Sequence, residues 1–327
     1  MADYDITCGL GNLRAENYSF IFVKGTLHVG KATLTVTAND QARPYGDGNP
    51  SFDAIITGFK NGQALATSGV SGTPGCTSAA GATSPVADYD IICTLGTLAA
   101  ANYSFEFAKG TLHVGKANLT VIADNKSMSL NGTFPALTGT LTGVKNNDGI
   151  TASYSTTGDG HAPGSFPISP SLSDPNSKLG NYQVTITNGK LTVLFAPATS
   201  ACVDAPGRTV LQPVNSDGSS VFKQGSTVPV KFRVCDANGA SIGAGGPVVK
   251  VGSDGHRAPV LWFASNTTGP IDEAVVSTTP DTDFRWDATS KQWIFNLSTK
   301  NLKSGVRYSY RVDLTDGTSI SFDFGTK

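Results

Sequence analysis

The sequence is poor in charged residues and in methionine, and it contains no long apolar run. Only 15% of its 327 residues are charged, the formal net charge is -1, and the 24 Lys and Arg residues form no cluster. This composition excludes the basic surface that nucleic-acid binding needs. No apolar run approaches the roughly 20 residues that span a bilayer, so we expect no membrane insertion. The two Met residues argue against helical packing.

The first residues, MADYDITCGLGN, have neither a basic segment nor an apolar core, so no signal peptide is predicted in this chain. Glycine and proline are abundant instead, with 37 and 17 residues. Together with many Thr, Ser and Asn residues they favour short strands joined by tight turns. The length suffices for two or three domains, each with its own core.

A long internal repeat organises the chain. Most of the segment Ala2–Val36 reappears at Ala87–Val121 without a gap, 85 positions later as counted from Cys8 to Cys93. Self-similarity at a fixed period indicates one folded unit that is used several times. The predicted divisions are 1–30 as the closing part of a unit, 31–115 as a complete repeat, 116–195 as a divergent repeat, 196–206 as a linker and 207–327 as a C-terminal β domain.

Alternating apolar and polar residues predict five to seven short strands in each repeat, paired as antiparallel hairpins and meanders. We expect an all-β protein of tandem small antiparallel modules, Ig-like sandwiches or related folds, followed by a distinct β-sandwich. Tyr18, Tyr103 and Tyr182 each open a strand, where such a tyrosine can pack inward and return its hydroxyl to the backbone, but Tyr18 is expected to be exposed because its segment lacks the opening strands of a unit. Two-residue hairpin turns are predicted at three steps, Lys24-Gly25, Lys109-Gly110 and Asn188-Gly189.

The run LTVTANDQARPYGDGNPSFDAIITGFKNGQ, followed by SPVADYDI, LAAANYSF and GTLHVGKA, resembles the MBG repeats of bacterial surface and secreted proteins. The resemblance is to the variety marked by Tyr-Gly after the first strand, here Tyr45-Gly46. The second copy has Leu130-Asn131 where Tyr-Gly is expected, which questions the turn there but not the fold. The resemblance implies tandem modules in an adhesin-like protein, with a spacer or display role.

The C-terminal region has its own pattern. The segment VPVKF, together with FRWDATSKQWIFNLSTKNL and a final hairpin, resembles the PxKF-type domain found at the C-terminal ends of bacterial extracellular proteins. Pro229, Lys231 and Phe232 match the motif that names it, and the resemblance implies no activity. Strand alternation predicts that Lys231 points to solvent while its neighbours point inward.

The five cysteines predict two disulfides. Cys76 and Cys93 fall within one repeat, and Cys202 and Cys235 fall in the C-terminal region, so we predict these two pairs and an oxidising compartment. Cys8 corresponds to Cys93, and the position of its partner lies outside this chain, so we expect it to be unpaired by truncation. Metal binding is not expected, because no paired Cys or His spacing is present.

No cluster of residues predicts catalysis or a cofactor. His28 and His113 are equivalent strand residues in separate repeats, which cannot share one metal ion. Three Asp/Asn-rich segments are interpreted as turns in preference to Ca²⁺ sites, because none is a full calcium loop: Asp47-Gly48-Asn49, Asn215-Ser216-Asp217-Gly218 and Asp236-Ala237-Asn238-Gly239. Trp262, Trp286 and Trp293 are candidates for a ligand platform, although core packing also explains alternating aromatics.

These observations predict a non-catalytic extracellular protein. It would be a stalk or adhesin-like fragment that presents or anchors a terminal β domain at a bacterial surface, next to further repeats of a longer parent chain. The alternative is a module that binds a cell-surface glycan or protein through aromatics of the C-terminal domain. The third and least favoured hypothesis is an accessory part of a secreted hydrolase.

Overall fold

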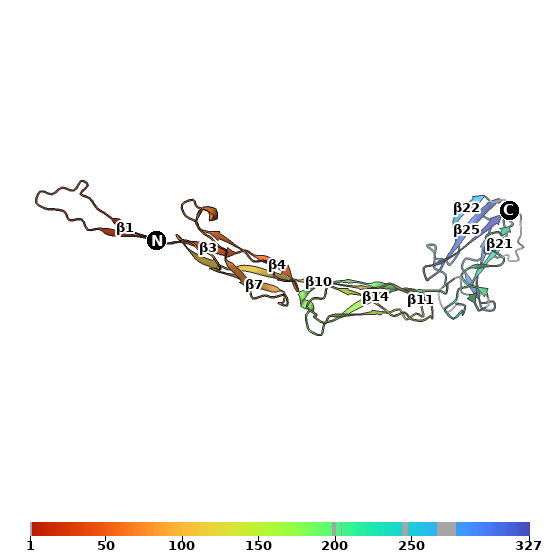
Figure 1. Ribbon diagram of the computed structural model, residues 1–327. Coiled ribbons are helices and arrows are strands. Elements are labelled where there is room, and N and C mark those ends of the chain that lie inside the picture. The colour runs from red at the N-terminus through yellow and green to blue at the C-terminus, as the bar shows by residue number, and fades with distance from the viewer. Residues whose placement is uncertain (1, 198–200, 204, 244–247, 267–278) are drawn as a thin grey trace. The chain divides into compact units, whose positions relative to one another are not determined.

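The computed structural model describes residues 2–197, 201–203, 205–243, 248–266 and 279–327 (Figure 1). These residues contain no α-helix, only the 3-10 turns η1 (Leu65–Thr67) and η2 (Leu179–Asn181). The prediction of an all-β protein is therefore confirmed. Contacts divide the chain into two compact units, of which the first comprises Met1–Leu119, Thr142–Ile150 and Asp174–Thr185. The second comprises Thr120–Leu141, Thr151–Ser173 and Ile186–Lys327, so the second repeat contributes to both.

The first complete repeat is a sandwich of a three-stranded and a four-stranded sheet, ordered β5-β3-β8 and β4-β9-β7-β6. Its strands are β3 (Ala32–Ala38), β4 (Gln41–Pro44), β5 (Ala54–Thr57), β6 (Gly75–Ser78), β7 (Ala87–Thr94), β8 (Tyr103–Ala108) and β9 (Gly110–Gly115). Every second residue of β3 and β9 points inward, and Leu34, Val36, Leu112 and Val114 are fully buried.

The second repeat has the same strand order, β12-β10-β15 and β11-β16-β14-β13. Its strands are β10 (Ala117–Ala123), β11 (Lys126–Ser129), β12 (Gly139–Thr142), β13 (Thr151–Thr156), β14 (Gly164–Ser173), β15 (Tyr182–Thr187) and β16 (Gly189–Leu194). The prediction that both repeats share one strand order is confirmed. The pair Tyr154 and Pro170 on β13 and β14 takes the place of Cys76 and Cys93 on β6 and β7.

The expectation of antiparallel pairing throughout is wrong. In the first repeat β3 pairs with β8, and β4 with β9, in parallel. In the second repeat β11 pairs with β16 in the same sense. Each opening strand lies beside a strand from the far end of its repeat, and parallel neighbours require such a long crossover connection. Local alternation of residues fixes the inward face of a strand but not the direction of its neighbour.

The Lys-Gly and Asn-Gly steps are not hairpin turns. β8 and β9 belong to different sheets, so Lys109-Gly110 is the point where the chain crosses the sandwich. Gly25, Gly110 and Gly189 are absent from the residues with positive φ. A Cβ on Gly110 would lie 2.5 Å from the carbonyl oxygen of Ala38, and one on Gly189 would lie 2.4 Å from that of Asp124. Glycine is needed here for a close backbone approach.

The C-terminal domain is a second kind of sandwich, with sheets β19-β21-β24-β23 and β20-β26-β25-β22 and the small pair β17-β18. Its strands are β17 (Ala201–Cys202), β18 (Ala205–Pro206), β19 (Val210–Leu211), β20 (Val221–Phe222), β21 (Thr227–Phe232), β22 (Val260–Asn266), β23 (Arg285–Asp287), β24 (Gln292–Ser298), β25 (Val306–Asp313) and β26 (Ser319–Thr326). Val230 and Phe232 are buried and Lys231 between them is half-buried. β20 and β26 pair in parallel.

The N-terminal segment forms a separate two-stranded antiparallel sheet of β1 (Ala2–Ile6) and β2 (Gly25–Val29). Its register reproduces that of β7 and β9: Ala2 faces Val29 as Ala87 faces Val114. The described residues between β1 and β2 contain no strand, so the prediction that Tyr18 opens one is wrong, and its side chain is 82% exposed, as expected for a segment without its partner strands.

Candidate functional site

A buried polar contact in the first compact unit lies where the two repeats meet. Tyr45 follows β4 of the first repeat, whereas Asp148 and Tyr182 belong to the second. The Tyr45 hydroxyl donates to Asp148 Oδ1 over 3.1 Å and the Tyr182 hydroxyl to Oδ2 over 2.6 Å. The rings of the two tyrosines meet edge to face, with centroids 5.6 Å apart. Exposed fractions of 1%, 6% and 2% show that Tyr45, Asp148 and Tyr182 are all withdrawn from solvent.

The tight loop Lys145–Asp148 of the second repeat positions the Asp148 carboxylate toward the two tyrosines. Asn146 and Asn147 adopt φ of 52° and 54°, a left-handed conformation that Asn tolerates better than most residues. The loop closes through the Asp148 amide, which donates to the carbonyl of Lys145 over 3.0 Å. The Lys145 amide donates to the Tyr182 hydroxyl over 2.9 Å. The expectation that Tyr182 returns its hydroxyl to the backbone is thus confirmed, and the same hydroxyl also reaches the junction.

Burial raises the pKa values of the two tyrosines at the junction. Removal from water is the main reason that the pKa of Tyr182 rises to about 12, and the hydrogen bond to Asp148 adds to the rise. Burial raises the pKa of Tyr45 in the same way. Both phenols are protonated at neutral pH, as an ordinary tyrosine is, and their raised pKa keeps them protonated to higher pH; each donates to the Asp148 carboxylate. Hydrogen bonds to an ionised acceptor are among the stronger ones in proteins.

Gly46 allows the two repeats to approach. Its φ is 84°, and a Cβ there would lie 2.5 Å from Cβ of Lys145 in the second repeat. The Lys145 ammonium in turn pairs with Asp47 over 3.0 Å, and the Asn146 side chain donates to the carbonyl of Ala82 over 3.2 Å. Both residues of the Tyr45-Gly46 step thus serve the junction, Tyr45 by filling it and Gly46 by leaving room.

Both repeats match a known protein family. Residues 34–113 and 119–192 match the family model of the MBG domain (YGX type). These segments are tandem MBG repeats. The first contains Tyr45-Gly46, the step that the type is named for. No curated protein matches the chain.

Solved structures with tandem β domains are also similar in part. The protocadherin GammaB4 extracellular domain is 13% identical over 99% of this chain and 56% of its own, with a TM-score of 0.21. Sidekick-1 immunoglobulin domains 1-4 are 9% identical over 96% and 80%, with a TM-score of 0.24. Domains 5-6 of the S-layer protein SbsC are 13% identical over 78% and 100%, with a TM-score of 0.16. Scores this low support no inference about function.

The second MBG repeat uses the equivalent turn to contact the C-terminal domain. Leu130 is buried, and Asn131 has φ of 57° where Gly46 has 84°. The Asn131 side-chain amide donates to Asp236 Oδ2 over 2.9 Å, and the carbonyl of Leu130 accepts from the amide of Ala237 over 2.9 Å. The turn is therefore retained without Tyr-Gly, because Asn can adopt the left-handed conformation.

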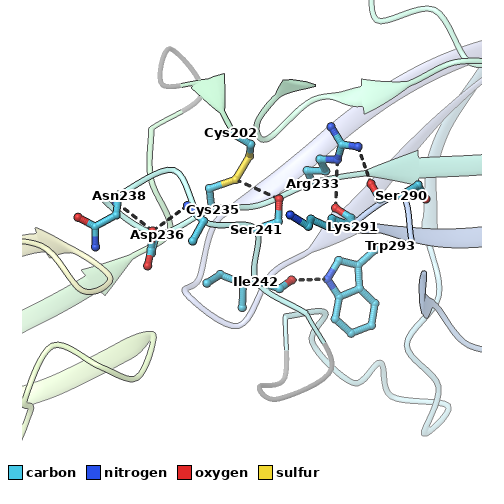
Figure 2. Close-up of a disulfide and its surroundings, with 11 residues drawn as sticks. Cys202, Arg233, Cys235, Asp236, Asn238, Ser241, Ile242, Ser290, Lys291 and Trp293 are labelled. Atoms are coloured by element: carbon cyan, nitrogen blue, oxygen red, sulfur yellow. Dashed lines mark hydrogen bonds between the residues drawn. A yellow bond between two sulfur atoms is a disulfide. The ribbon is translucent and has the colours of Figure 1, made fainter. Parts of the chain in front are cut away.

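Asp236 organises the receiving loop of the C-terminal domain (Figure 2). Its Oδ1 accepts the backbone amides of Asn238 and Ala240 over 2.9 and 3.0 Å. Burial pushes the pKa of Asp236 upward, but hydrogen bonds from Asn131, Ala240 and Asn238 outweigh this and hold the pKa below its usual value. The carboxylate is thus occupied by turn and junction contacts.

Both predicted disulfides are present. Cys76 and Cys93 lie directly opposite each other on β6 and β7. Figure 2 shows the bond that joins Cys202 and Cys235, and both residues are buried. The amide of Ala196 donates to the carbonyl of Cys235 over 2.7 Å, so the described part of the predicted linker is tied to that domain. Cys8 is a free thiol and is exposed.

The three tryptophans are not brought together. Trp293 is buried, its indole N–H donates to the carbonyl of Ile242 over 2.9 Å (Figure 2), and Trp286 packs against it with centroids 5.7 Å apart. Trp262 lies on β22 in the other sheet and is 60% exposed, next to the exposed Phe263. Trp293 is thus a core residue, whereas Trp262 is a surface residue.

His28 and His113 lie on the surfaces of strands β2 and β9. His28 pairs with Asp3 over 2.7 Å and His113 with Asp88 over 2.6 Å, and all four side chains are exposed. In the part of the chain that the structure describes, no three His, Cys, Asp or Glu residues are grouped to hold a metal ion. No helix among those residues is long and apolar enough to cross a membrane.

Proposed function

We propose that this is a non-catalytic extracellular repeat protein, in which the MBG repeats form a spacer that presents the C-terminal β domain at a bacterial surface. The observation that supports this most directly is the burial of Tyr45 against Asp148 and Tyr182 of the next repeat. A fully satisfied buried polar network has one preferred geometry and resists bending at the junction. A spacer needs this property to hold its terminal domain away from its point of attachment.

Two further features support an extracellular location. Disulfides persist in oxidising environments and are rare in the cytosol of mesophiles, and this chain has two. The C-terminal region, with Pro229, Lys231 and Phe232, resembles domains that end bacterial extracellular proteins. We infer that the C-terminal domain is the displayed or anchoring part of the molecule.

The restricted bending at the junction between the two MBG repeats can be measured directly as a distribution of distances. Nitroxide labels at Thr111→Cys and Gln183→Cys, both exposed, report on one repeat each in a Cys8→Ser chain. Pulsed electron paramagnetic resonance should give a narrow distance distribution, and Asp148→Ala should broaden it. Asp90→Ala, which removes an exposed ion pair with Lys109, should leave the distribution unchanged. A distribution that is already broad without Asp148→Ala would contradict the spacer proposal.

The exposed aromatic pair favours a second candidate function, recognition of a glycan or protein. Trp262 and Phe263 lie side by side on β22, an edge strand, with ring centroids 6.3 Å apart. Aromatic faces stack on sugar rings and form anchors at protein interfaces. Trp262→Ala should abolish retention on an array of surface glycans, whereas Trp286→Phe should not. Equal retention by the Trp262→Ala chain and the parent chain would rule out this surface as the binding site.

A further inference from the structure

The turn after the second strand of each MBG repeat, here called the junction turn, is held in the same way in both copies. It comprises residues 45–47 in the first repeat and 130–132 in the second. The amide of Tyr45 donates to the carbonyl of Gly115 over 2.8 Å, and the amide of Leu130 donates to that of Leu194 over 2.7 Å. Both acceptors are the last residues of closing strands, β9 and β16. The two repeats therefore place the same turn at the same end.

Each junction turn contacts a tight loop of the domain that follows it in the sequence. Loop 145–148 closes through the amide of Asp148, and loop 236–239 closes through the amide of Gly239, which donates to the carbonyl of Asp236 over 3.0 Å. In each loop one carboxylate accepts a hydrogen bond from the preceding repeat, Asp148 from the Tyr45 hydroxyl and Asp236 from the Asn131 amide. The acid is the last residue of one loop and the first residue of the other. The two loops therefore require their donors at different places.

Glycine occupies the position of the junction turn that the following loop approaches. In the first repeat this position is Gly46, where a Cβ would lie 2.5 Å from Cβ of Lys145. In the second repeat it is Gly132, where a Cβ would lie 3.2 Å from Cβ of Ala237 and 2.9 Å from the carbonyl oxygen of Ser129 in the same turn. The residue equivalent to Gly132 is Asp47, which pairs with the Lys145 ammonium over 3.0 Å. The room that each turn leaves thus matches one loop and not the other.

We propose that the junction turn specifies which kind of domain an MBG repeat accepts as its C-terminal neighbour. Tyr45-Gly46-Asp47 fits loop 145–148 of a following MBG repeat, and Leu130-Asn131-Gly132 fits the Asp-Ala-Asn-Gly loop of the C-terminal domain. Each turn combines contacts that favour its own neighbour with features that disfavour the other, which is how interfaces become specific. The proposal goes beyond the spacer function, because it concerns the order of the domains along the chain.

The structure shows why the two turns are not interchangeable. With Tyr-Gly-Asp at positions 130–132, Asp236 would lose the Asn131 amide and gain a second carboxylate beside its loop. With Leu-Asn-Gly at positions 45–47, Asp148 would lose the Tyr45 hydroxyl, and the new Cβ at position 46 would meet Lys145. Residues that build one junction should therefore break the other.

The test exchanges the two turns within the full chain. One variant carries Leu130→Tyr, Asn131→Gly and Gly132→Asp, and the other carries Tyr45→Leu, Gly46→Asn and Asp47→Gly. Two backbone amides report on the junctions by hydrogen exchange. Val86 of the first repeat donates to Asn181 Oδ1 of the second over 3.0 Å, and Ala237 of the C-terminal domain donates to the carbonyl of Leu130 over 2.9 Å.

The variant at 130–132 should speed amide exchange of Ala237 by about tenfold or more and leave that of Val86 unchanged, and the variant at 45–47 should do the reverse. Amides of β9 and β16 should keep their rates in both variants, which shows that the repeats still fold. Unchanged exchange of Ala237 in the first variant, or of Val86 in the second, would overturn the proposal, because a turn would then accept either neighbour. Faster exchange of both amides in one variant would also overturn it.

A smaller change tests the second junction without altering the shape of its turn. Asn131→Asp places a carboxylate opposite Asp236 and should speed exchange of Ala237 by about tenfold. Adding Asp236→Asn restores an amide opposite a carboxylate and keeps an oxygen for the two backbone amides that Asp236 accepts. Exchange of Ala237 should then return to within about threefold of the parent chain, and no recovery would overturn the proposal. The distance measurement between the MBG repeats uses unaltered junction turns, so its failure is distinguishable from this one.

Discussion

The hydroxyl of Tyr45 donates a hydrogen bond to the carboxylate of Asp148, 103 positions further along the chain and in the next MBG repeat. The same carboxylate accepts from Tyr182 over 2.6 Å, so one acid serves a tyrosine from each repeat. Residues that share a network are coupled in their effect on stability. The stability of the first repeat is therefore linked to that of the second.

Asp148→Ala should lower the free energy of unfolding by about 1.5–3 kcal/mol, because it leaves two buried phenols without their charged acceptor. Urea unfolding followed by tyrosine fluorescence measures the loss. Asp90→Ala removes an exposed ion pair and should cost within about 1 kcal/mol. If both substitutions cost the same, the buried carboxylate does not stabilise the junction.

Alkaline pH should weaken the junction. The pKa of Tyr182 is raised from 10.0 to about 12 in the folded chain, mainly by burial. The unfolded chain therefore loses this proton first, so the stabilisation is complete below pH 10 and is lost as pH rises toward 12. This difference between the folded and the unfolded pKa corresponds to roughly 2–3 kcal/mol of folding stability. Between pH 9 and pH 11 the midpoint of urea unfolding should decrease in a Cys8→Ser chain. The decrease should be smaller in the same chain with Tyr182→Phe. Parallel falls would contradict the assignment.

Gly46→Ala should destabilise the junction by about 1–3 kcal/mol, because its φ of 84° is costly for alanine and the new Cβ would meet Lys145. Gly48→Ala is the matched control, since a Cβ there has no neighbour within 4 Å and its φ is not positive. That change should stay within about 0.5 kcal/mol. Thermal unfolding of both variants measures the difference, and a neutral Gly46→Ala would show that the repeats do not need this close approach.

Removing the first disulfide with Cys76→Ser and Cys93→Ser should cost about 3 kcal/mol, the value expected for a loop with a sequence separation of 17. Amide exchange should localise the loss to β6 and β7, which the bond joins. The corresponding change at Cys202 and Cys235 should loosen the segment around Ala196 and leave β6 and β7 unaffected. Uniform loss of protection after either change would contradict this local effect.

Much of the fold could be predicted because its signals are local in the sequence. The internal repeat divided the chain, and alternation at Leu34 and Val36, and at Leu112 and Val114, marked the inward faces that are now buried. The disulfide pairs could be predicted because Cys76 and Cys93 lie in one repeat, and Cys202 and Cys235 lie in the C-terminal region. Strand direction could not be predicted in this way, since the same alternation fits a parallel or an antiparallel neighbour.

The role of the Tyr-Gly step illustrates the same limit at the candidate site. The sequence marked Tyr45 and Gly46 as the signature of the repeat, but their partners Asp148, Tyr182 and Lys145 lie in the following repeat. Nothing in the local pattern at Tyr45 reports on a carboxylate 103 residues away. The pKa of Tyr182 is raised mainly by burial, and Tyr45 of the preceding repeat contributes to the rise, which only the folded structure reveals.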